Sequence, residues 1–577
     1  MIKNKFKQMN TKKNLLLILG VIFLFSCKDT DKKHLENTAQ VYFGGDIITM
    51  VGQAPDYAEA LVVKDGKISF VGSSSEAMTV AGAGHQMIDL EGRTLVPGFI
   101  DGHCHFATFG AQAIGGQLLA SPDANVDDIE TLISVMKEWN TPQNRELTGW
   151  IFGTGFDDSV LKEKRFPTKH DLDKISTKYP IMITHISGHF AVVNSKGLEK
   201  LGINADTKNP EGGIIRREQN SNEPNGVLEE LAAIPYMLEA IGPKSEEAGI
   251  KFFEAGQAMA LSYGYTTAQE GRAMQNHEFL TTMADSQKLK IDVVSYIDYL
   301  FVDKYMNSKW NSKEYINKYR IGGMKVTLDG SPQGRTAWRT QPYLLPPDGM
   351  PEDYKGYPAI PNDSILSSIY EKAFVNNWQI LSHTNGDAAV DQMIRTLKPL
   401  NEKYGNEGRR DVIIHGQYIR ADQLDEAKKM NMIASLFPLH TFYWGDWHKE
   451  LIGDSLGNKI SPVRTALNKG VKITIHTDAP VALPSLMRVL WTAVERTSRS
   501  GKVIGEDERL TPYEALKAIT IWSAYQHFEE DKKGTLENGK LADLVILDKN
   551  PLKVKADEIK DIQVIETIKK GVTVFKK

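Results

Sequence analysis

The sequence predicts an α/β fold: a (β/α)8 barrel of the TIM type, with a small β-sandwich built from both chain ends and a large insertion after the first barrel strand. Eight short apolar runs end in polar or turn residues, and most are separated by stretches with helical spacing. Strands that alternate with helices pair in parallel, and eight such units can close into a barrel. The runs cover residues 94–104, 264–269, 291–297, 323–328, 378–382, 411–414, 432–437 and 471–475.

The predicted small sandwich comes from β-rich segments at 41–95 and 534–577. These segments contain short runs of β-branched and aromatic residues that are broken by glycines, with tight turns such as Lys64-Asp65-Gly66-Lys67. That turn between two apolar runs is typical of a hairpin. Because both chain ends share this pattern of short β-rich runs, we expect them to form one small domain beside the barrel.

The predicted insertion occupies about 115–245. The gap between the first and second apolar runs is far longer than a single crossover needs, and it contains strand-like segments at 150–155 and 181–186. The barrel is therefore expected at 96–533, with this insertion inside it.

The first residues have the pattern of an export signal. Five lysines precede an unbroken apolar run from Leu15 to Phe25, which is too short to cross a hydrocarbon core of about 30 Å. Leu24-Phe25-Ser26-Cys27 resembles the lipobox of bacterial lipoproteins. That resemblance implies a signal peptide at 1–26, lipidation of Cys27, and a membrane-anchored lipoprotein of the cell envelope. A plain signal peptide with an incidental cysteine is the alternative. The polar residues 27–40 are expected to be a flexible tether.

Composition excludes several classes of protein. The 577 residues are 41% hydrophobic and 25% charged, which is typical of a globular protein and not of a disordered chain. The net charge of −4 shows no basic excess, so no nucleic-acid partner is expected. Two cysteines, Cys27 and Cys104, exclude a disulfide framework.

Polar side chains with metal-binding chemistry fall at the ends of the apolar runs. His103 and His105 follow the first run, and residues two apart in a strand point the same way, so both can bind one ion. In a barrel, strand ends meet at one mouth. The other residues of this kind are Lys325, His383, His415 and Asp478.

Together these motifs resemble the amidohydrolase superfamily, and more narrowly its amidohydrolase-3 branch, which includes N-substituted formamide deformylases. The resemblance extends over about residues 41–577. It is carried by the segments 97–105, 185–198, 264–267, 325–331, 383–388, 414–417, 476–481 and 534–544.

The resemblance implies a metal centre with one or two divalent ions, usually zinc. His103 and His105 would bind one ion, and His383 and His415 a second. Lys325 would be N-carboxylated and bridge them, because a carbamate is an anionic oxygen ligand whereas an ammonium repels a cation. An uncarboxylated lysine in an ion pair is the alternative, and Glu270 is a rival bridging carboxylate.

The implied reaction is attack by a metal-bound hydroxide, with Asp478 as a further metal-site residue that acts as general base and then general acid. His189, inside the insertion, would polarise the scissile carbonyl, or else be a structural histidine. The branch commonly has small residues before its final aspartate, whereas this chain has His476-Thr477. His476 either supports the site or simply packs.

We therefore expect a metal-dependent hydrolase that acts on a non-peptide C–N bond of a small molecule: an amide, formamide or cyclic amide. Ester or lactone hydrolysis on the same site is the nearest alternative. A lipid-anchored binding protein without activity is the alternative from another class. The sequence leaves the oligomeric state open.

Overall fold

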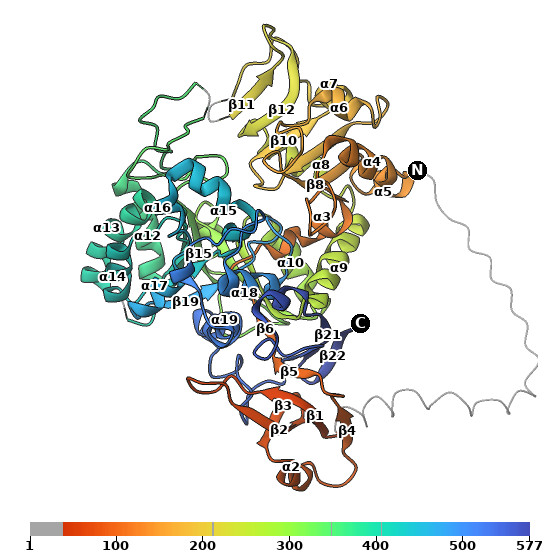
Figure 1. The fold of residues 1–577 in the computed structure, drawn as a ribbon, viewed down its shortest axis with the longest axis vertical. Helices are drawn as coiled ribbons and strands as arrows, with labels where there is room; N and C mark the ends of the chain where they lie inside the picture. The colour runs from red at the N-terminus through yellow and green to blue at the C-terminus, as the bar shows by residue number, and fades with distance from the viewer. Residues whose placement is uncertain (1–37, 211–212, 348, 406) are drawn as a thin grey trace, which may run out of the picture.

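The computed structural model describes residues 38–577 apart from residues 211, 212, 348 and 406. The predicted signal peptide (1–26), the lipidation site Cys27 and nearly all of the predicted tether (27–40) lie outside the described residues. In the described part, no helix combines the length and apolar character that crossing a membrane requires. Figure 1 shows the insertion at the top, the barrel in the middle and the small sheet at the bottom.

Eight parallel strands form the central sheet, which confirms the predicted α/β fold of the TIM type. The strands are nearly continuous runs of buried residues, as expected where helices cover the outside of a parallel sheet. In spatial order they are β6 (Phe99–Ile100), β13 (Tyr265–Ala273), β14 (Asp292–Asp298), β15 (Tyr319–Thr327), β16 (Gln379–Thr384), β17 (Val412–His415), β18 (Ile433–Leu436) and β19 (Lys472–Ile475).

The first predicted run, 94–104, is wrong as a single strand. Its first part, β5 (Thr94–Pro97), belongs to the small sheet, whereas β6 pairs with β13 of the barrel. The chain changes sheets at Gly98, so the small sheet extends two residues beyond the expected boundary at 95. A Cβ at Gly98 would lie 2.3 Å from Cγ2 of Thr266, so the chain crosses between the two sheets where only glycine fits.

Backbone hydrogen bonds link the first and last barrel strands, β6 and β19, just beyond their carboxyl ends. The N–H of Asp478 donates to the carbonyl of His103 (3.0 Å), and the N–H of His105 donates to the carbonyl of Ala479 (2.8 Å). The segment after β19 thus lies beside the segment after β6. This contact joins the ends of the central sheet at its carboxyl edge.

The helices form a layer around the barrel (Figure 1). Side chains cap the starts of some of them: Ser245 accepts from the N–H of Ala248 at the start of α9, and Asn362 does the same for Ile365 in α12. They are α9 (Glu246–Ser262), α10 (Asn276–Asp285), α11 (Val302–Tyr305), α12 (Asp363–Val375), α13 (Asp387–Tyr404), α14 (Ala421–Lys429), α15 (Leu439–Ile452), α16 (Asp454–Gly457), α17 (Val463–Asn468), α18 (Leu486–Glu495), α19 (Pro512–Ala518) and α20 (Ile521–Gln526).

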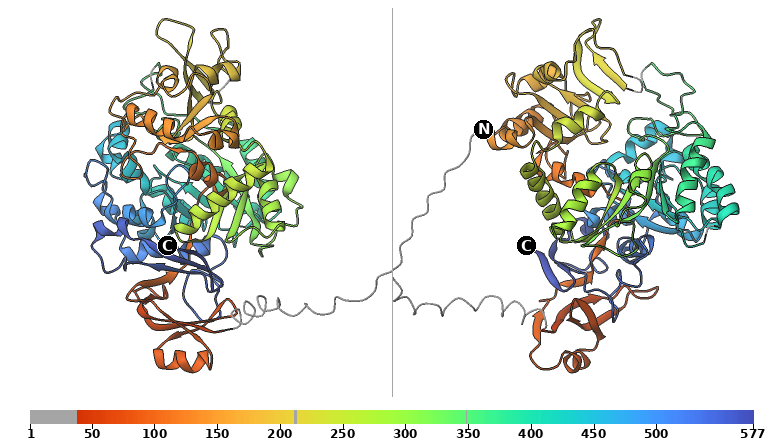
Figure 2. Two further views of the ribbon diagram at one scale, coloured as in Figure 1. Left: turned by 90° about the vertical axis from the view of Figure 1, so that its right-hand side faces the viewer. Right: turned by 180° about the vertical axis from the view of Figure 1, so that it is seen from behind.

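The insertion leaves the barrel after β6 through α3 (Phe109–Ile114) and returns through α9. It contains its own six-stranded sheet and hydrophobic core, at the end of the barrel opposite the small sheet (Figure 2). Its strands are β11 (Gly213–Arg217), β12 (Pro224–Glu230), β10 (Phe190–Val193), β9 (Ile181–His185), β8 (Ile151–Phe156) and β7 (Gly116–Gln117). Its helices are α4 (Ile129–Trp139), α5 (Pro142–Thr148), α6 (Lys169–Asp173), α7 (Ser195–Leu201) and α8 (Ile234–Ile241).

The small sheet combines strands from both chain ends, seen as red and blue arrows in Figure 1. All eight strands are hydrogen-bonded into one sheet, which branches at β1: this strand pairs with β4 through residues 40–43 and with β5 through residues 46–47. Asp65 and Gly66 both have positive φ, which confirms the tight hairpin between β2 and β3. The strands are β1 (Gln40–Ile48), β2 (Tyr57–Lys64), β3 (Lys67–Gly72), β4 (Gln86–Asp89), β5, β20 (Leu544–Leu547), β21 (Val564–Lys569) and β22 (Val572–Lys576).

A buried ion network ties the small sheet to the barrel. Asp292, at the start of β14, accepts from Nζ of Lys533 (2.5 Å) and from Nζ of Lys569 on β21 (2.6 Å). Lys569 also donates to Asp543 (2.7 Å). Burial alone would raise the pKa of the Asp292 carboxyl, but the two ammonium groups outweigh it and hold that pKa well below its ordinary value.

We predict that Asp292→Asn lowers the free energy of unfolding by about 3–5 kcal/mol at pH 7, because two buried ammonium groups lose a shared counter-charge. A carboxyl with a depressed pKa contributes its full stability above its unfolded pKa, near 4, and loses it as the pH falls through the folded value. The gap between variant and wild type should therefore shrink below about pH 4. Denaturation by urea across this pH range measures both effects. Asp303→Asn, at an exposed carboxylate, is the control, and equal stability of wild type and Asp292→Asn at pH 7 would contradict the prediction.

Candidate metal centre

The structure brings six of the predicted site residues together at the carboxyl ends of the barrel strands. One ligand atom from each of His103, His415 and Asp478 lies within 4.8 Å of the other two. The rings of His383 and His415 are 4.7 Å apart between centroids. The six residues are His103 and His105 after β6, Lys325 on β15, His383 on β16, His415 at the end of β17, and Asp478 after β19.

Asp478 lies at the centre of this group. Its Oδ1 is 3.4 Å from Nε2 of His105 and 3.6 Å from Nε2 of His103, and its Oδ2 is 4.0 Å from Nε2 of His415. Burial would raise the pKa of the Asp478 carboxyl, but a hydrogen bond with His105 and the nearby positive groups lower it below the ordinary value. Asp478 is therefore a carboxylate at neutral pH.

Lys325 is buried beside the same histidines. Its Nζ lies 3.1 Å from Nε2 of His103, and the residue is 2% exposed. Burial lowers the pKa of the Lys325 ammonium to about 7, against the opposing effect of the Asp478 carboxylate. A considerable fraction of this amine is neutral near pH 7.

Three of the histidine rings point Nε2 toward the cluster, and Nδ1 of each ring contacts a neighbouring side chain. Nδ1 of His103 donates to Oε1 of Gln269 (2.5 Å), Nδ1 of His383 donates to Oδ1 of Asp329 (3.1 Å), and Nδ1 of His415 lies 3.2 Å from Nε2 of His476. Metal-binding histidines are held in this way, because the partner sets the tautomer and the ring orientation.

Burial lowers the pKa of His103, His383 and His415, so these rings are neutral and keep a lone pair for a cation. Neutral imidazoles, a carboxylate and a neutral amine in one buried cluster are a donor set that suits a divalent metal such as zinc. The residues present therefore fit the metal that the sequence predicts.

The backbone around the site is strained in two places. His415 and Asp478 adopt φ values of 73° and 52°, in the left-handed region that residues other than glycine rarely occupy. Such conformations persist where the surrounding structure imposes them, and they cluster at functional sites.

Residues 86–575 match the family described as the amidohydrolase family. This match spans most of the chain. The chain belongs to the amidohydrolase family.

Curated relatives and a solved structure are similar over nearly the whole length. The amidohydrolase YtcJ of Bacillus subtilis is 26% identical and is aligned over 93% of this chain and 99% of its own. The N-substituted formamide deformylase of Arthrobacter pascens is 24% identical, over 89% and 94%. A metal-dependent hydrolase from Pyrococcus furiosus has a TM-score of 0.69 and 25% identity, and the similarity covers 89% of this chain and 100% of that one.

His189 lies in the insertion, directly before β10. Its Nδ1 is 2.8 Å from Oε2 of Glu230. Burial would lower the pKa of His189, but Glu230 outweighs it and raises that pKa, and the Asp478 carboxylate acts in the same direction. His189 is thus within electrostatic reach of the centre, although it belongs to a different domain.

The rival bridge, Glu270, has a carboxylate engaged by the backbone. Oε2 accepts from the N–H of Ala107 (2.8 Å) and Oε1 from the N–H of Arg272 (3.3 Å). Oε1 stands 4.0 Å from Nδ1 of His105. Burial raises the pKa of Glu270. The structure therefore gives Glu270 a role in holding the loop after β6.

Sequence reasoning assigned no role to several residues that orient the ligands. Asp329 follows the end of β15, and that position was the available signal, whereas Gln269 lies in the middle of β13. Gly271 had no signal: a Cβ there would lie 2.2 Å from Cε1 of the His103 ring, so glycine lets this ring pass close to β13.

His476 contacts a predicted ligand, His415. It is fully buried, its Nε2 faces Nδ1 of His415, and its Nδ1 lies 2.9 Å from the hydroxyl of Ser435 on β18. Burial lowers the pKa of His476 to about 3, so the ring is neutral. Ser435, His476 and His415 form a chain that ends at the metal-facing Nε2 of His415.

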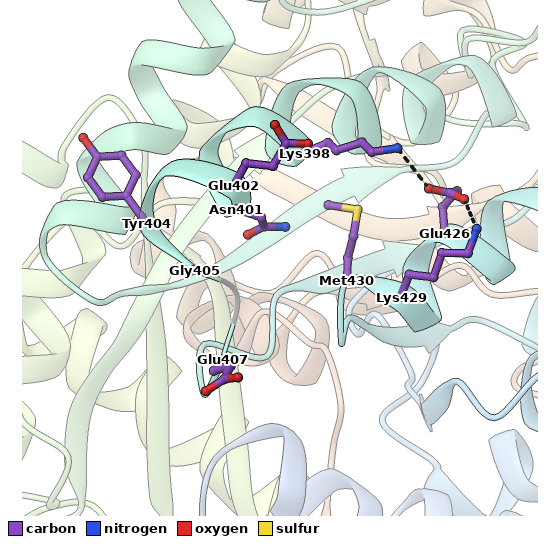
Figure 3. A pocket seen from close by; sticks show the side chains of 9 residues that line it. All are labelled: Lys398, Asn401, Glu402, Tyr404, Gly405, Glu407, Glu426, Lys429 and Met430. Carbon is purple, nitrogen blue, oxygen red and sulfur yellow. Dashed lines mark hydrogen bonds and ion pairs between the residues drawn. The ribbon is translucent and has the colours of Figure 1, made fainter.

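A surface pocket between α13 and α14 lies away from this centre (Figure 3). It is lined by the ends of both helices, which lead back to the amino ends of β17 and β18, and Lys398 and Lys429 both pair with Glu426 there. Catalytic groups of such barrels sit at the opposite face. The pocket contains none of the predicted site residues.

We predict that His476→Leu weakens zinc binding by about 10–100-fold, because Nδ1 of His415 loses the partner that orients the ring. His476→Gln keeps a side-chain oxygen that can accept from Nδ1, so it should recover part of the affinity. Competition with a chromophoric chelator measures both variants. Wild-type affinity in His476→Leu would show that the ring only packs.

Proposed function

We propose that this protein is a metal-dependent hydrolase that cleaves a non-peptide amide-type C–N bond. The observation that carries the proposal is the convergence of four histidines, Lys325 and Asp478 at the barrel mouth, where partners on Nδ1 fix the rings of three of the histidines. His103, His105, His383, His415 and Lys325 would hold one or two divalent ions, with zinc the ion that this donor set suits best.

A divalent ion in such a site lowers the pKa of a water toward neutrality and supplies a nucleophile without Ser or Cys. Asp478 then works as the proton-transfer group. Its carboxylate is ionised and lies within 4.0 Å of three histidine Nε2 atoms, so it can accept a proton at the centre of the cluster and deliver it to the leaving nitrogen.

Lys325 is proposed to be N-carboxylated. Its Nζ is buried against Nε2 of His103, where a permanent ammonium would repel a metal ion that the histidine binds. Carboxylation removes that charge and turns the side chain into an oxygen ligand. An intact-protein mass in bicarbonate buffer that lacks one added carbon dioxide would favour the ion-pair alternative.

His189 is proposed to bind the carbonyl oxygen of the substrate. Glu230 holds its Nδ1 and raises its pKa, which favours a ring that carries a proton on Nε2 as a hydrogen-bond donor. A donor placed where negative charge develops stabilises the transition state. The insertion would thus complete a site that the barrel begins.

The proposed substrates are N-substituted formamides and related acyclic or cyclic amides. The similarity to the N-substituted formamide deformylase of Arthrobacter pascens over 89% of this chain supports this class. A panel of N-formyl, N-acyl and cyclic amides, with matched esters and lactones, tests it. Faster turnover of the esters and lactones would replace the amide assignment.

The cell-envelope location is also proposed, from Leu24-Phe25-Ser26-Cys27. An acylated Cys27 would tether the enzyme to a membrane outside the cytoplasm. Labelling with a fatty-acid analogue checks it, and label that persists in Cys27→Ser would refute the assignment.

We predict that Asp478→Asn retains bound metal but loses about 10²–10⁴-fold in kcat, because the amide cannot accept the proton. Metal content by mass spectrometry and steady-state kinetics on the best amide of the panel give the two readouts. Asp173→Asn, at a carboxylate in the insertion that binds Ser195, is the control. Unchanged kcat in Asp478→Asn would remove its assigned role.

A further inference from the structure

A second group of metal-ligand side chains lies in the insertion, outside the barrel centre. Asp157 and Asp158 directly follow β8, and His185 is the last residue of β9. The two strands are parallel neighbours, with Phe156 opposite His185, so the three side chains meet at the carboxyl edge of the insertion sheet. One carboxylate oxygen of each aspartate and one ring nitrogen of His185 lie within 4.8 Å of one another.

Two buried polar atoms in this group have no hydrogen-bond partner in the described part of the chain: Oδ2 of Asp157 and Nε2 of His185. Asp157 is 4% exposed and His185 is 6% exposed. Oδ1 of Asp157 accepts from the N–H and the hydroxyl of Ser159, so Oδ2 is left for another ligand. A buried polar atom without a partner costs about 1–3 kcal/mol, and two side by side call for a common explanation.

The contact between His185 and Asp158 does not remove this cost. Nε2 of His185 lies 3.1 Å from Oδ1 of Asp158, yet it makes no hydrogen bond to that oxygen. A proton on Nε2 would have no acceptor in line with it. A cation between the ring nitrogen and the carboxylates has no such directional requirement, and it would satisfy Nε2 and Oδ2 of Asp157 together.

The other nitrogen of His185 lies against Ser187, which fixes the plane of the ring. Nδ1 is 2.8 Å from the hydroxyl of Ser187, and the backbone N–H of Ser187 donates to it (3.2 Å). A cation bound at Nε2 would place the ring proton on Nδ1, where the hydroxyl, the nearer group, would accept it. Around the ring, Phe156, Phe166 and Phe190 exclude water from its faces.

We propose that Asp157, Asp158 and His185 bind a divalent transition-metal ion at a second site, independent of the barrel centre and of the proposed function. One imidazole and two carboxylates suit Zn²⁺ or Mn²⁺, whereas Ca²⁺ and Mg²⁺ prefer oxygen ligands throughout. Two carboxylates balance the charge of the ion. The Asp158 side chain is 30% exposed, which leaves an open side where water completes the coordination.

The ion would stabilise the loop that carries His189. The hydroxyl of Ser187, which binds the His185 ring, also accepts from the N–H of His189 (3.3 Å), and the N–H of Gly188 donates to the carbonyl of His185 (2.9 Å). A ligand that fixes His185 therefore fixes the turn leading to His189. The site would act as a structural clamp on that turn.

Zinc stoichiometry of the full chain tests the proposal. The protein is stripped of metal with a chelator, dialysed against Zn²⁺ and analysed by mass spectrometry for bound metal. His185→Gln and Asp158→Asn should each bind one equivalent fewer than wild type, whereas Asp173→Asn, an aspartate of the same domain outside the group, should match wild type. Wild-type stoichiometry in both test variants would overturn the proposal.

A His103→Ala background separates the two centres. This variant should keep the equivalent bound in the insertion, and adding Asp158→Asn should remove it. Hydrogen exchange of residues 186–189 gives a second readout: Zn²⁺ should slow it at least about tenfold in His103→Ala and leave it unchanged in the double variant. Because Asp158 is partly exposed, its replacement tests the site even if His185→Gln does not fold. Exchange that Zn²⁺ slows equally in both would overturn the clamp.

Discussion

The metal centre depends on the contact that joins the last barrel strand to the first. The hydrogen bonds between Asp478 and His103 and between His105 and Ala479 place three predicted ligands from the first and last barrel strands side by side. Asp101 stabilises this contact: its carboxylate accepts from Thr477 and from the hydroxyl of Tyr265, and burial still raises its pKa to about 6. Without this closure, Asp478 would belong to a loop far from His103.

Burial controls the protonation states of the basic groups around this contact. It lowers the pKa of His103, His383 and His415 and of the Lys325 ammonium, so that these basic side chains do not repel a cation. Buried neutral groups still need partners, and Gln269, Asp329 and His476 each supply one from within or just after a different barrel strand. The orientation of the ligands therefore results from the whole ring of strands rather than from any one motif.

Much of the architecture could be predicted from local pattern, because period, length and turn residues report on neighbouring positions in the chain. Alternating apolar runs and helical stretches indicated the parallel barrel, and the pair His103 and His105 indicated metal ligands near the first barrel strand, although both residues follow β6 rather than lie on it. The run 94–104 was wrongly predicted as one strand, because the prediction used only local pattern. Both halves are apolar, and the change of sheet at Gly98 depends on Thr266, far along the chain.

The sequence by itself determined the fold class and the identity of the ligand-type residues, since each of these depends on short stretches of the chain. Only the tertiary structure decided which groups orient them. Gln269 reaches His103 across 166 residues, and Ser435 reaches His476 across 41, and no local pattern encodes such pairs. The same holds for Asp157 and His185, whose unpartnered atoms become neighbours only when β8 and β9 pair. Hydrogen-bond partners at this range are set by strand register and closure, which the chain fixes only when it is folded.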